Sequence, residues 1–142
     1  MSVRVYISGD TTAVAVGAER VAQRFEVEAT QAELTYELVR NGSRGAFGLE
    51  PLLEVDSARG RVGFAAVTAE DIPEVIRCLK EGIFDHPKSV GLIAEIPWLS
   101  NQTRVTFKRC GEGAPTDLKN YQRLGGYEGL KNALALSSQE VV

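Results

Sequence analysis

Residues 40–55, RNGSRGAFGLEPLLEV, decide the fold of this chain. The first half is rich in Gly and polar residues, which is typical of a loop. The second half passes through Pro51 into Leu52–Val55, a short and mostly apolar run that is typical of a strand. A Gly-rich loop that leads directly into a strand marks a junction in the fold, and the elements on either side can be placed from it.

A strand, a helix and a second strand are predicted before this loop. Residues 3–7 alternate apolar and polar side chains and contain β-branched types, as a strand does. Apolar residues then recur at helical spacing between residues 12 and 30, with charged residues on the other side. Residues 34–39 again favour a strand. A strand–helix–strand unit with a long crossover is most often parallel and right-handed.

Two short strands and a helix are predicted after the loop. The strands are Leu52–Val55 and Arg61–Ala66, joined by residues 56–60 as a hairpin loop that contains Gly. Apolar residues between 72 and 79 indicate a second amphipathic helix, with Thr68 or Asp71 as its cap and Pro73 in its first turn. The predicted fold class is therefore α/β, in the order β-α-β-β-β-α.

The character of the sequence changes near residue 82. Residues 82–102 have poor periodicity and are expected to be a linker or arm. Residues 104–107 resemble a brief strand, and residues 116–124 and 127–136 resemble two short helices. Ser137 and Glu140 have the spacing of a capping box, which signals a helix that begins just before the sequence stops. We therefore expect the chain to be a fragment of a longer protein, with a frayed natural tail as the alternative.

Composition excludes several classes of protein. The net charge is −3 and the basic residues are not clustered, which argues against nucleic acid as the main partner. There is no apolar run of membrane-spanning length and no signal-peptide pattern at the start. Two Cys, Cys78 and Cys110, are too few for a disulfide scaffold. A cytoplasmic protein with reduced thiols is expected.

The loop at residues 42–47 resembles part of an iron–sulfur site. Thioredoxin-like [2Fe–2S] ferredoxin domains carry their second ligand pair in a G-C-x-x-x-C loop shortly before a Pro and an apolar strand. The corresponding positions here are Ser43 and Phe47, and the first pair would fall near Ser8 and Ala13. Since such clusters are held by Cys thiolates, the resemblance implies a thioredoxin-like domain without cluster ligands, and we expect this segment to bind no cofactor.

The resemblance extends over nearly all of the chain. Residues 39–75 are similar to the ferredoxin domain that precedes the NADH-binding flavoprotein in modular dehydrogenases. Residues 102–142, with Cys110-Gly111 and the run 125–130 (GGYEGL), are similar to the entry into that flavoprotein. The residues around the 40–52 loop and Glu95-Ile96-Pro97-Trp98-Leu99 most resemble the β (diaphorase) subunit of soluble NAD-dependent formate dehydrogenases. That family is related to the NADH-binding flavoprotein of respiratory complex I.

This resemblance implies a domain organisation, cofactors and partners. Residues 1–81 would be the thioredoxin-like domain, 82–102 a linker or arm, and 103–142 the truncated start of the flavoprotein domain. The parent family holds FMN, NAD and iron–sulfur clusters and passes electrons through FMN to NAD. Its partners would be the remainder of the flavoprotein subunit, a small [2Fe–2S] thioredoxin-like subunit and a formate-oxidising molybdenum or tungsten subunit. The same segment of an NAD-linked hydrogenase or complex I-like dehydrogenase is an alternative.

The candidate functional residues are docking residues. Arg40, Asn41, Ser43 and Arg44 lie in or beside the Gly-rich loop, where the two Arg side chains would pair with acidic groups of a partner. Trp98 would anchor in a groove of another domain or subunit. The alternatives are that the Arg side chains are merely solvated and that Trp98 covers the core of its own domain.

No catalytic or metal-binding residue is predicted. Without a C-x-x-C motif a disulfide oxidoreductase is not expected, and Cys78 and Cys110 are interpreted as structural. His86 is the only His and has no carboxylate pair nearby. The function predicted from the sequence is a structural or docking segment, with a stand-alone thioredoxin-like binding module as the alternative.

Overall fold

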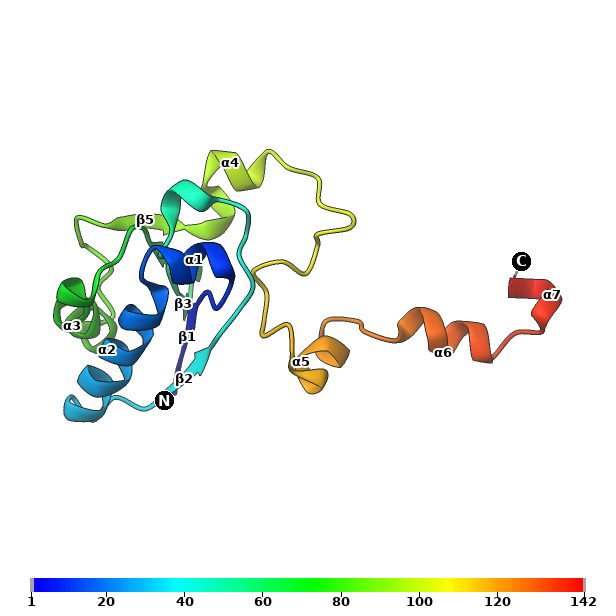
Figure 1. Cartoon of the computed structure of the whole chain (residues 1–142), viewed down its shortest axis with the longest axis horizontal. Helices are drawn as coiled ribbons and strands as arrows, with labels where there is room; N and C mark the ends of the chain where they lie inside the picture. The colour runs from blue at the N-terminus through cyan, green and yellow to red at the C-terminus, as the bar shows by residue number, and fades with distance from the viewer. Residues whose placement is uncertain (1, 142) are drawn as a thin grey trace.

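The computed structural model describes residues 2–141 and is built around a five-stranded sheet. The strands lie in the order β2-β1-β3-β4-β5 (Figure 1). Their bounds are β1 Val3–Ile7, β2 Tyr36–Val39, β3 Leu53–Ser57, β4 Gly60–Phe64 and β5 Ser89–Leu92. β1 and β2 are parallel, and the other neighbouring strands are antiparallel. The predicted parallel strand–helix–strand unit and the hairpin are both confirmed.

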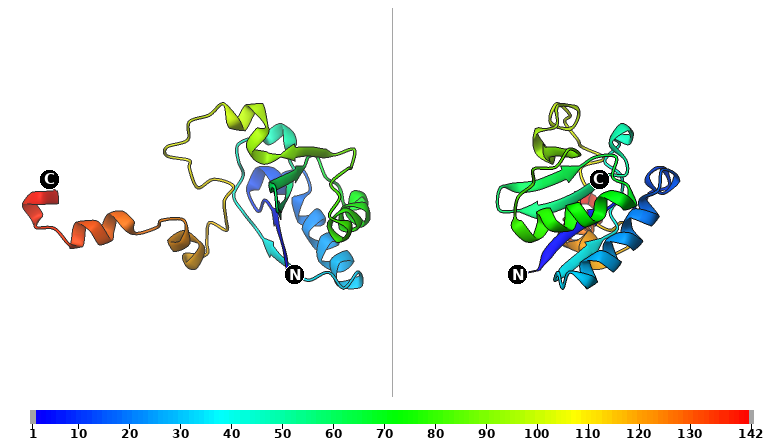
Figure 2. Two further views of the ribbon diagram at one scale, coloured as in Figure 1. Left: turned by 180° about the vertical axis from the view of Figure 1, so that it is seen from behind. Right: turned by 90° about the vertical axis from the view of Figure 1, so that its left-hand side faces the viewer.

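The helices α2 (Ala18–Gln31) and α3 (Ile72–Glu81) lie side by side on one face of the sheet (Figure 2). The helix expected over residues 12–30 is divided, because Gly17 has φ +107° and separates α1 (Thr11–Ala15) from α2. Such a positive φ is accessible to Gly and breaks the helical path. A capping box between Thr68 and Asp71 begins the short 3₁₀ turn η2 (Ala69–Asp71) that leads into α3.

The hydrophobic core lies between this helix pair and the sheet. Alternate strand residues point toward the helices, because successive side chains of a strand face opposite sides. The strand and helix side chains that meet there include Val5, Ile7, Leu53, Val55 and Phe64 from the sheet, and Val21, Phe25, Ile72, Val75 and Leu79 from the helices. Each buried side chain of this size stabilises the fold by roughly 1.5–3 kcal/mol.

Residues 82–102 contain a strand that the sequence pattern did not predict. β5 pairs with β4 and forms one edge of the sheet. The 3₁₀ turn η3 (Ile93–Glu95) follows and buries Ile93 against Gly63, whose missing side chain leaves the room that Ile93 fills. The helix α4 (Pro97–Ser100) comes next. Residues 89–92 of the expected linker are therefore part of the sheet.

The residues after α4 extend away from the sheet (Figure 1), and we call this C-terminal part the arm. It carries the short helices α5 (Leu118–Arg123), α6 (Glu128–Leu134) and α7 (Ser138–Val141), close to the positions predicted. The strand expected at residues 104–107 is not formed, since these residues lie in a turn-rich segment. The α/β fold with a helical C-terminal arm is thus confirmed. Within residues 2–141 no helix has the length and apolar character needed to cross a membrane.

Candidate functional site: a charged cluster between the sheet and the arm

The face of the sheet opposite the helices carries polar side chains. The strand register places Tyr6 of β1, Glu54 of β3 and Gly63 of β4 in one row across the sheet. The next row contains Asp56 of β3 opposite Arg61 of β4. Because no helix of the core covers this face, its charged groups are free to meet the segments that follow the sheet.

Glu54 is the centre of this face. Its side chain is only 2% exposed, yet it carries a carboxylate. Arg44 binds it through two parallel hydrogen bonds, of 2.7 Å from Nε to Oε1 and 2.9 Å from Nη2 to Oε2. Arg61 donates a third, of 3.2 Å from Nη1 to Oε2. A buried carboxylate needs compensation of this kind, because removing an unpaired charge from water is strongly unfavourable.

The carboxylates around Arg44 also raise the pKa of its guanidinium. Burial by itself lowers the pKa of a guanidinium, since it disfavours the charged form. The hydrogen bonds and negative charges of Glu54 and then Glu112 together outweigh this effect, and the pKa of Arg44 is raised above its ordinary value. Arg44 is therefore a permanent cation that is held inside the molecule.

Arg61 connects the cluster to Tyr6 and Asp56. Its guanidinium carbon lies 3.6 Å from the centre of the Tyr6 ring, a cation–π contact, and its Nε donates to Asp56 at 3.1 Å. The Tyr6 hydroxyl donates to the other oxygen of Asp56 at 2.9 Å. Burial, followed by the hydrogen bond to Asp56, raises the pKa of Tyr6. Tyr6 is consequently a neutral donor in this network.

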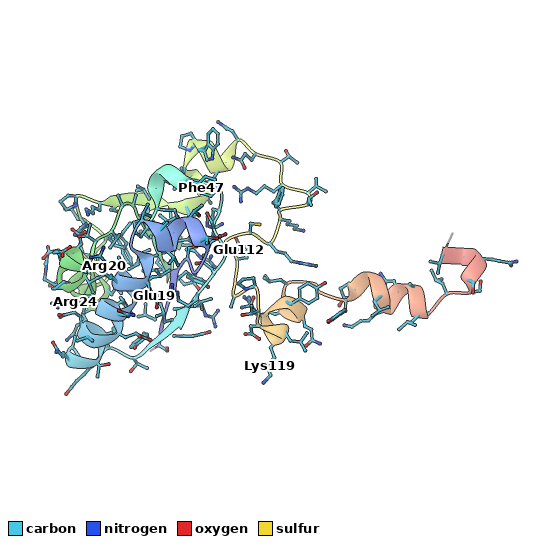
Figure 3. All side chains as sticks on the ribbon, in the orientation of Figure 1. Glu19, Arg20, Arg24, Phe47, Glu112 and Lys119 are labelled. Atoms are coloured by element: carbon cyan, nitrogen blue, oxygen red, sulfur yellow. The ribbon has the colours of Figure 1, made fainter. Side chains whose placement is uncertain are left out.

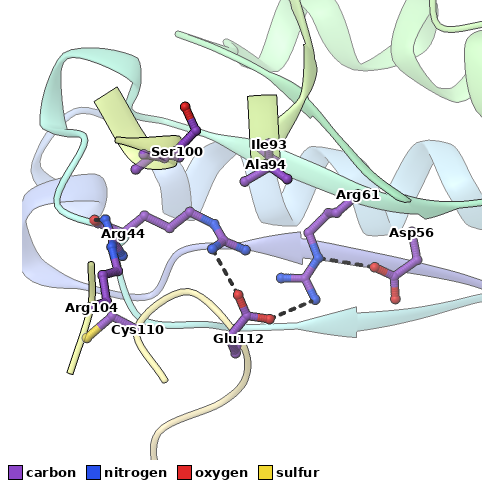
Figure 4. Close-up of a pocket in the computed structure, with 10 residues that line it drawn as sticks. Arg44, Asp56, Arg61, Ile93, Ala94, Ser100, Arg104, Cys110 and Glu112 are labelled. Atoms are coloured by element: carbon purple, nitrogen blue, oxygen red, sulfur yellow. Dashed lines mark hydrogen bonds and ion pairs between the residues drawn. The ribbon is translucent and has the colours of Figure 1, made fainter. Parts of the chain in front are cut away.

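The arm enters the cluster through Gly111 and Glu112. The carbonyl oxygen of Gly111 accepts hydrogen bonds from Asn41 Nδ2 at 3.0 Å, Arg61 Nη1 at 2.9 Å and Arg44 Nη2 at 3.3 Å. The carboxylate of Glu112 lies between the two arginines, 3.0 Å from Arg44 Nη1 and 3.7 Å from Arg61 Nη2 (Figure 4). We call this set of contacts the latch. It fixes one point of the arm to the polar face of the sheet.

Only Gly fits at position 111. The residue has φ +82°, in the left-handed region that disfavours side chains. A Cβ at this position would also overlap the side chain of Arg44. Glu112 is visible at the junction in Figure 3, where the arm leaves the sheet, and Lys119 lies on α5, the first helix of the arm. The latch therefore depends on the backbone of Gly111 and on the side chain of Glu112.

A second attachment lies seven residues before Gly111. Arg104 Nη2 donates to the backbone carbonyl of Arg44 at 2.7 Å. An open pocket of about 480 Å³ lies between the charged cluster and the segment that carries Ile93 and Ser100. A larger groove of about 840 Å³ lies beside it, between the 43–47 loop and residues 98–107. The two attachments thus place a stretch of the arm along the sheet and create concave surfaces there.

The residues at the four inferred ligand positions do not fit a [2Fe–2S] cluster. The Ser43 hydroxyl donates to Glu50, the Ser8 hydroxyl accepts from the backbone N–H of Asp10, and the remaining two side chains are those of Ala13 and Phe47. None is a thiolate, the ligand that these clusters use. In the part of the chain that the structure describes, no group of three or more His, Cys, Asp or Glu side chains could hold a metal ion.

The structure places the predicted docking residues in different environments. Arg40 bonds the carbonyls of Ile7 and Ser8 and pairs with Glu19 at 2.9 Å. Asn41 is buried and donates to the Gly111 carbonyl in the latch. Arg44 forms ion pairs with Glu54 and Glu112. The structure thus contradicts both sequence interpretations of Arg44, because it is neither solvated nor open to a partner's acidic groups.

Ser43 and Trp98 remain on the surface beside the larger groove. Both line it, and Trp98 is 66% exposed, so this Trp does not cover the core of its own domain. The structure therefore excludes the structural alternative for Trp98. Its docking role stays a prediction.

The cysteines and His86 form no shared site. Cys78 lies buried on α3, where burial raises the pKa of its thiol. Cys110 precedes the latch and lines the larger groove. His86 packs edge-on against Phe64 and accepts a hydrogen bond from the backbone N–H of Lys88. The burial of Cys78 agrees with its structural interpretation.

Among the charged residues of this cluster, only Arg44 was expected from the sequence to have a functional role. Glu54 is the charged residue within the otherwise apolar Leu52–Val55, and this interruption is the signal that marks it as a buried, paired group. Arg61 and Glu112 carry no comparable signal, because their partners are distant in sequence.

Comparison with known proteins identifies the fold. No protein-family model matches the chain, and no curated protein sequence matches it. Among solved structures, the thioredoxin-like [2Fe–2S] ferredoxin from Aquifex aeolicus matches with a TM-score of 0.54 and 20% identity, covering 63% of this chain and 97% of the ferredoxin. A Cys-to-Ser variant of that ferredoxin matches with a TM-score of 0.53 and 24% identity, covering 63% and 98%. Over this part of its length the chain therefore has a thioredoxin-like fold.

Proposed function

We propose that this chain is a cluster-free docking segment of the NADH-binding flavoprotein subunit of a soluble NAD-dependent formate dehydrogenase. The segment would take no part in electron transfer itself. It would brace the flavoprotein, which passes electrons through FMN to NAD, against a small [2Fe–2S] thioredoxin-like subunit and, within the same complex, a formate-oxidising molybdenum or tungsten subunit.

The latch is the observation that carries this proposal. A thioredoxin-like body is bonded through Gly111 and Glu112 to an arm whose helices α5, α6 and α7 contribute no buried residue. Exposed apolar side chains on that arm, such as Leu118, Leu130 and Leu134, are typical of a surface that packs on a further domain. The latch would set the position of the body relative to that domain.

The residues that remain at the ligand positions support a structural role. The solved structures that this chain resembles are named as thioredoxin-like [2Fe–2S] ferredoxins. Here Ser43 is engaged with Glu50 and Phe47 is 60% exposed. A thioredoxin-like domain without cluster ligands still has a defined shape and surface, and a docking element needs only these.

Assembly and activity of the full-length subunit test the proposal. NADH oxidation with an artificial acceptor would be measured on this chain and on the full-length flavoprotein subunit, and only the full-length subunit should turn over. In the full-length subunit, Glu112→Gln should leave this NADH oxidation unchanged and reduce formate-dependent NAD reduction by the assembled complex. Glu37→Gln, on the exposed pair with Arg4, is the matched control. Turnover by this chain alone would overturn the proposal.

A stand-alone binding module is the second candidate. The observation in its favour is that the latch satisfies the charges of the polar sheet face within the chain. Such a module would bind its partner equally well after removal of residues 114–142, whereas the docking segment would not assemble.

A further inference from the structure

The first part of the arm closes on itself around the latch. Arg109, which precedes the latch, donates from Nε to the carbonyl of Leu124 at 3.0 Å and from Nη2 to the carbonyl of Gly125 at 2.8 Å. Its guanidinium carbon also lies 4.9 Å from the centre of the Tyr121 ring. The last carbonyls of a helix have no partner within the helix, and a basic side chain can satisfy them. Arg109 therefore joins the chain just before the latch to the C-terminal end of α5.

A second contact joins α5 to the residue that follows the latch. Gly113 is buried, and a Cβ at this position would overlap the side-chain amide of Asn120. The amide therefore packs directly on the backbone of Gly113. α5 is thus held from both sides of the latch, by Arg109 before it and by Gly113 after it.

The end of α5 is closed by a tight turn. The N–H of Gly126 donates to the carbonyl of Tyr121 at 2.8 Å, and Gly125 has φ +81°. This combination is a Schellman motif, which ends a helix with a left-handed residue. The ring of Tyr127 then packs edge-on against Tyr121, with 5.1 Å between the ring centres. Contacts of the side chains and the backbone therefore tie residues 109–127 together, and we call these residues the bracket.

Contacts of this kind end at Tyr127. Within residues 2–141, one hydrogen bond joins residues 128–141 to the preceding part of the chain, from the N–H of Lys131 to the carbonyl of Tyr127 at 2.9 Å. The helices α6 and α7 bury no residue and extend away from the body (Figure 1). Helices of one or two turns are not stable in isolation. The bracket gives α5 the contacts that such a short helix needs, whereas α6 lacks them.

We infer that the arm has a hinge at the junction of Tyr127 and Glu128. The bracket moves with the sheet as one rigid piece, because the latch lies within it and bonds it to the polar face. Residues 128–141 turn about the hinge, where a few residues at the end of an element absorb the changes in φ and ψ. This inference goes beyond the proposed docking function, since it holds for the chain alone: α5 keeps a fixed position on the body, and α6 and α7 do not.

Nuclear magnetic relaxation of the backbone amide nitrogens in the full chain tests the inference. An order parameter of about 0.85 marks rigid backbone, and one below about 0.6 marks flexible backbone. We expect residues 111–126 to be as ordered as the strands of the sheet and residues 129–141 to fall below the lower value. Low order that begins before α5, or high order through residue 141, would overturn the inference. Because no partner is present, neither result depends on whether the chain docks in a dehydrogenase.

A pair of arginine variants tests what holds the bracket together. Arg109→Met removes the donors to the end of α5 and should lower the order of residues 113–126 to the level of residues 129–141. Arg123→Met is the matched control, because Arg123 is an exposed residue of the same helix whose side chain has no hydrogen bond or ion pair in the described part of the chain. Its order should equal that of the unaltered chain. Equal effects of the two variants would overturn the role of the bracket.

Gly126→Ala tests the bracket from its other end. A Cβ at position 126 would overlap the side chain and the carbonyl of Tyr121, so the turn that closes α5 should open and the order of α5 should fall. The order of the sheet strands in each variant shows that the body is still folded. An α5 that stays rigid both in Gly126→Ala and in Arg109→Met would contradict the inference.

Discussion

Arg44 holds Glu54 by two parallel hydrogen bonds, of 2.7 and 2.9 Å, on the face of the sheet that the helices leave uncovered. The pair joins a Gly-rich loop to a central strand. The same guanidinium reaches Glu112 of the arm at 3.0 Å. The side chain of Arg44 therefore connects the Gly-rich loop, strand β3 and the arm.

Removing the carboxylate of Glu54 should destabilise the fold strongly. Glu54→Gln leaves Arg44 and Arg61 partly buried beside a neutral group, and breaking a buried charge pair costs about 3–5 kcal/mol of unfolding free energy. The control Glu37→Gln removes the exposed pair with Arg4 and should cost at most about 1 kcal/mol. Chemical denaturation measures both. Equal, small effects would show that Glu54 is not a centre of stability.

Gly111→Ala should release the arm from the sheet. The substitution combines an unfavourable φ of +82° with an overlap of the new methyl group and Arg44. In the unaltered chain, we expect the amides around Gly111 to exchange slowly and those of α6 and α7 to exchange fast, because α6 and α7 bury no residue. Hydrogen exchange of the variant should become fast at Cys110 and Glu112, whose backbone N–H groups donate to the carbonyls of Phe107 and Arg109.

Gly129→Ala on α6 is the matched control for this exchange experiment, since no atom within 4 Å would meet its Cβ. Its exchange pattern around Gly111 should equal that of the unaltered chain. Slow exchange through the whole arm would contradict the view that the latch and the Arg104 hydrogen bond fix only its first part.

The stability contributed by Glu50 should rise as the pH falls. Burial raises the pKa of Glu50 above its ordinary value of 4.5, and the hydrogen bonds from Leu52 and Ser43 offset this only in part. Because the folded state binds this proton more tightly than the unfolded state, folding takes up a proton between 4.5 and the raised pKa. Glu50→Gln removes the effect.

Denaturation of the two proteins between about pH 7 and about pH 4.5 measures this contribution as the difference between them. The unaltered chain should gain stability relative to Glu50→Gln on acidification. A relative loss would mean that the carboxylate is held ionised in the fold.

Anaerobic treatment with iron and sulfide should give no stable cluster. The four inferred ligand positions hold Ser8, Ala13, Ser43 and Phe47, and the two cysteines are on different parts of the chain. Absorbance and bound iron after gel filtration measure the outcome. A stable brown protein whose colour is lost when Cys78 and Cys110 are both changed to Ser would disprove the prediction.

The sequence predicted the elements that depend on local patterns. The alternation at residues 3–7 and the apolar spacing of α3 arise from contact with one core, so the periodicity alone identifies them. The division between α1 and α2 was missed because it depends on the φ of a single residue, Gly17. β5 was missed because it is short and contains Gly91 at φ +72°, so its pairing with β4 comes from tertiary contacts.

The latch was beyond prediction from sequence patterns. Arg44 and Glu112 are 68 residues apart, and Arg61 reaches Gly111 across 50 residues. Charged residues at such separations give no periodic signal, because their pairing follows from strand register and from the path of the arm. The docking role of the Gly-rich loop stays a prediction, and its Arg44 faces inward to Glu54 and Glu112.

The native mass and metal content of whatever assembly is purified through this chain from its own cells test the proposed docking role. If the proposal is right, we expect an assembly that contains a flavin-binding subunit, a small [2Fe–2S] subunit and a molybdenum or tungsten subunit, and that dissociates when Glu112→Gln is combined with Gly111→Ala. A protein that migrates alone, without flavin, iron or molybdenum or tungsten, would contradict it.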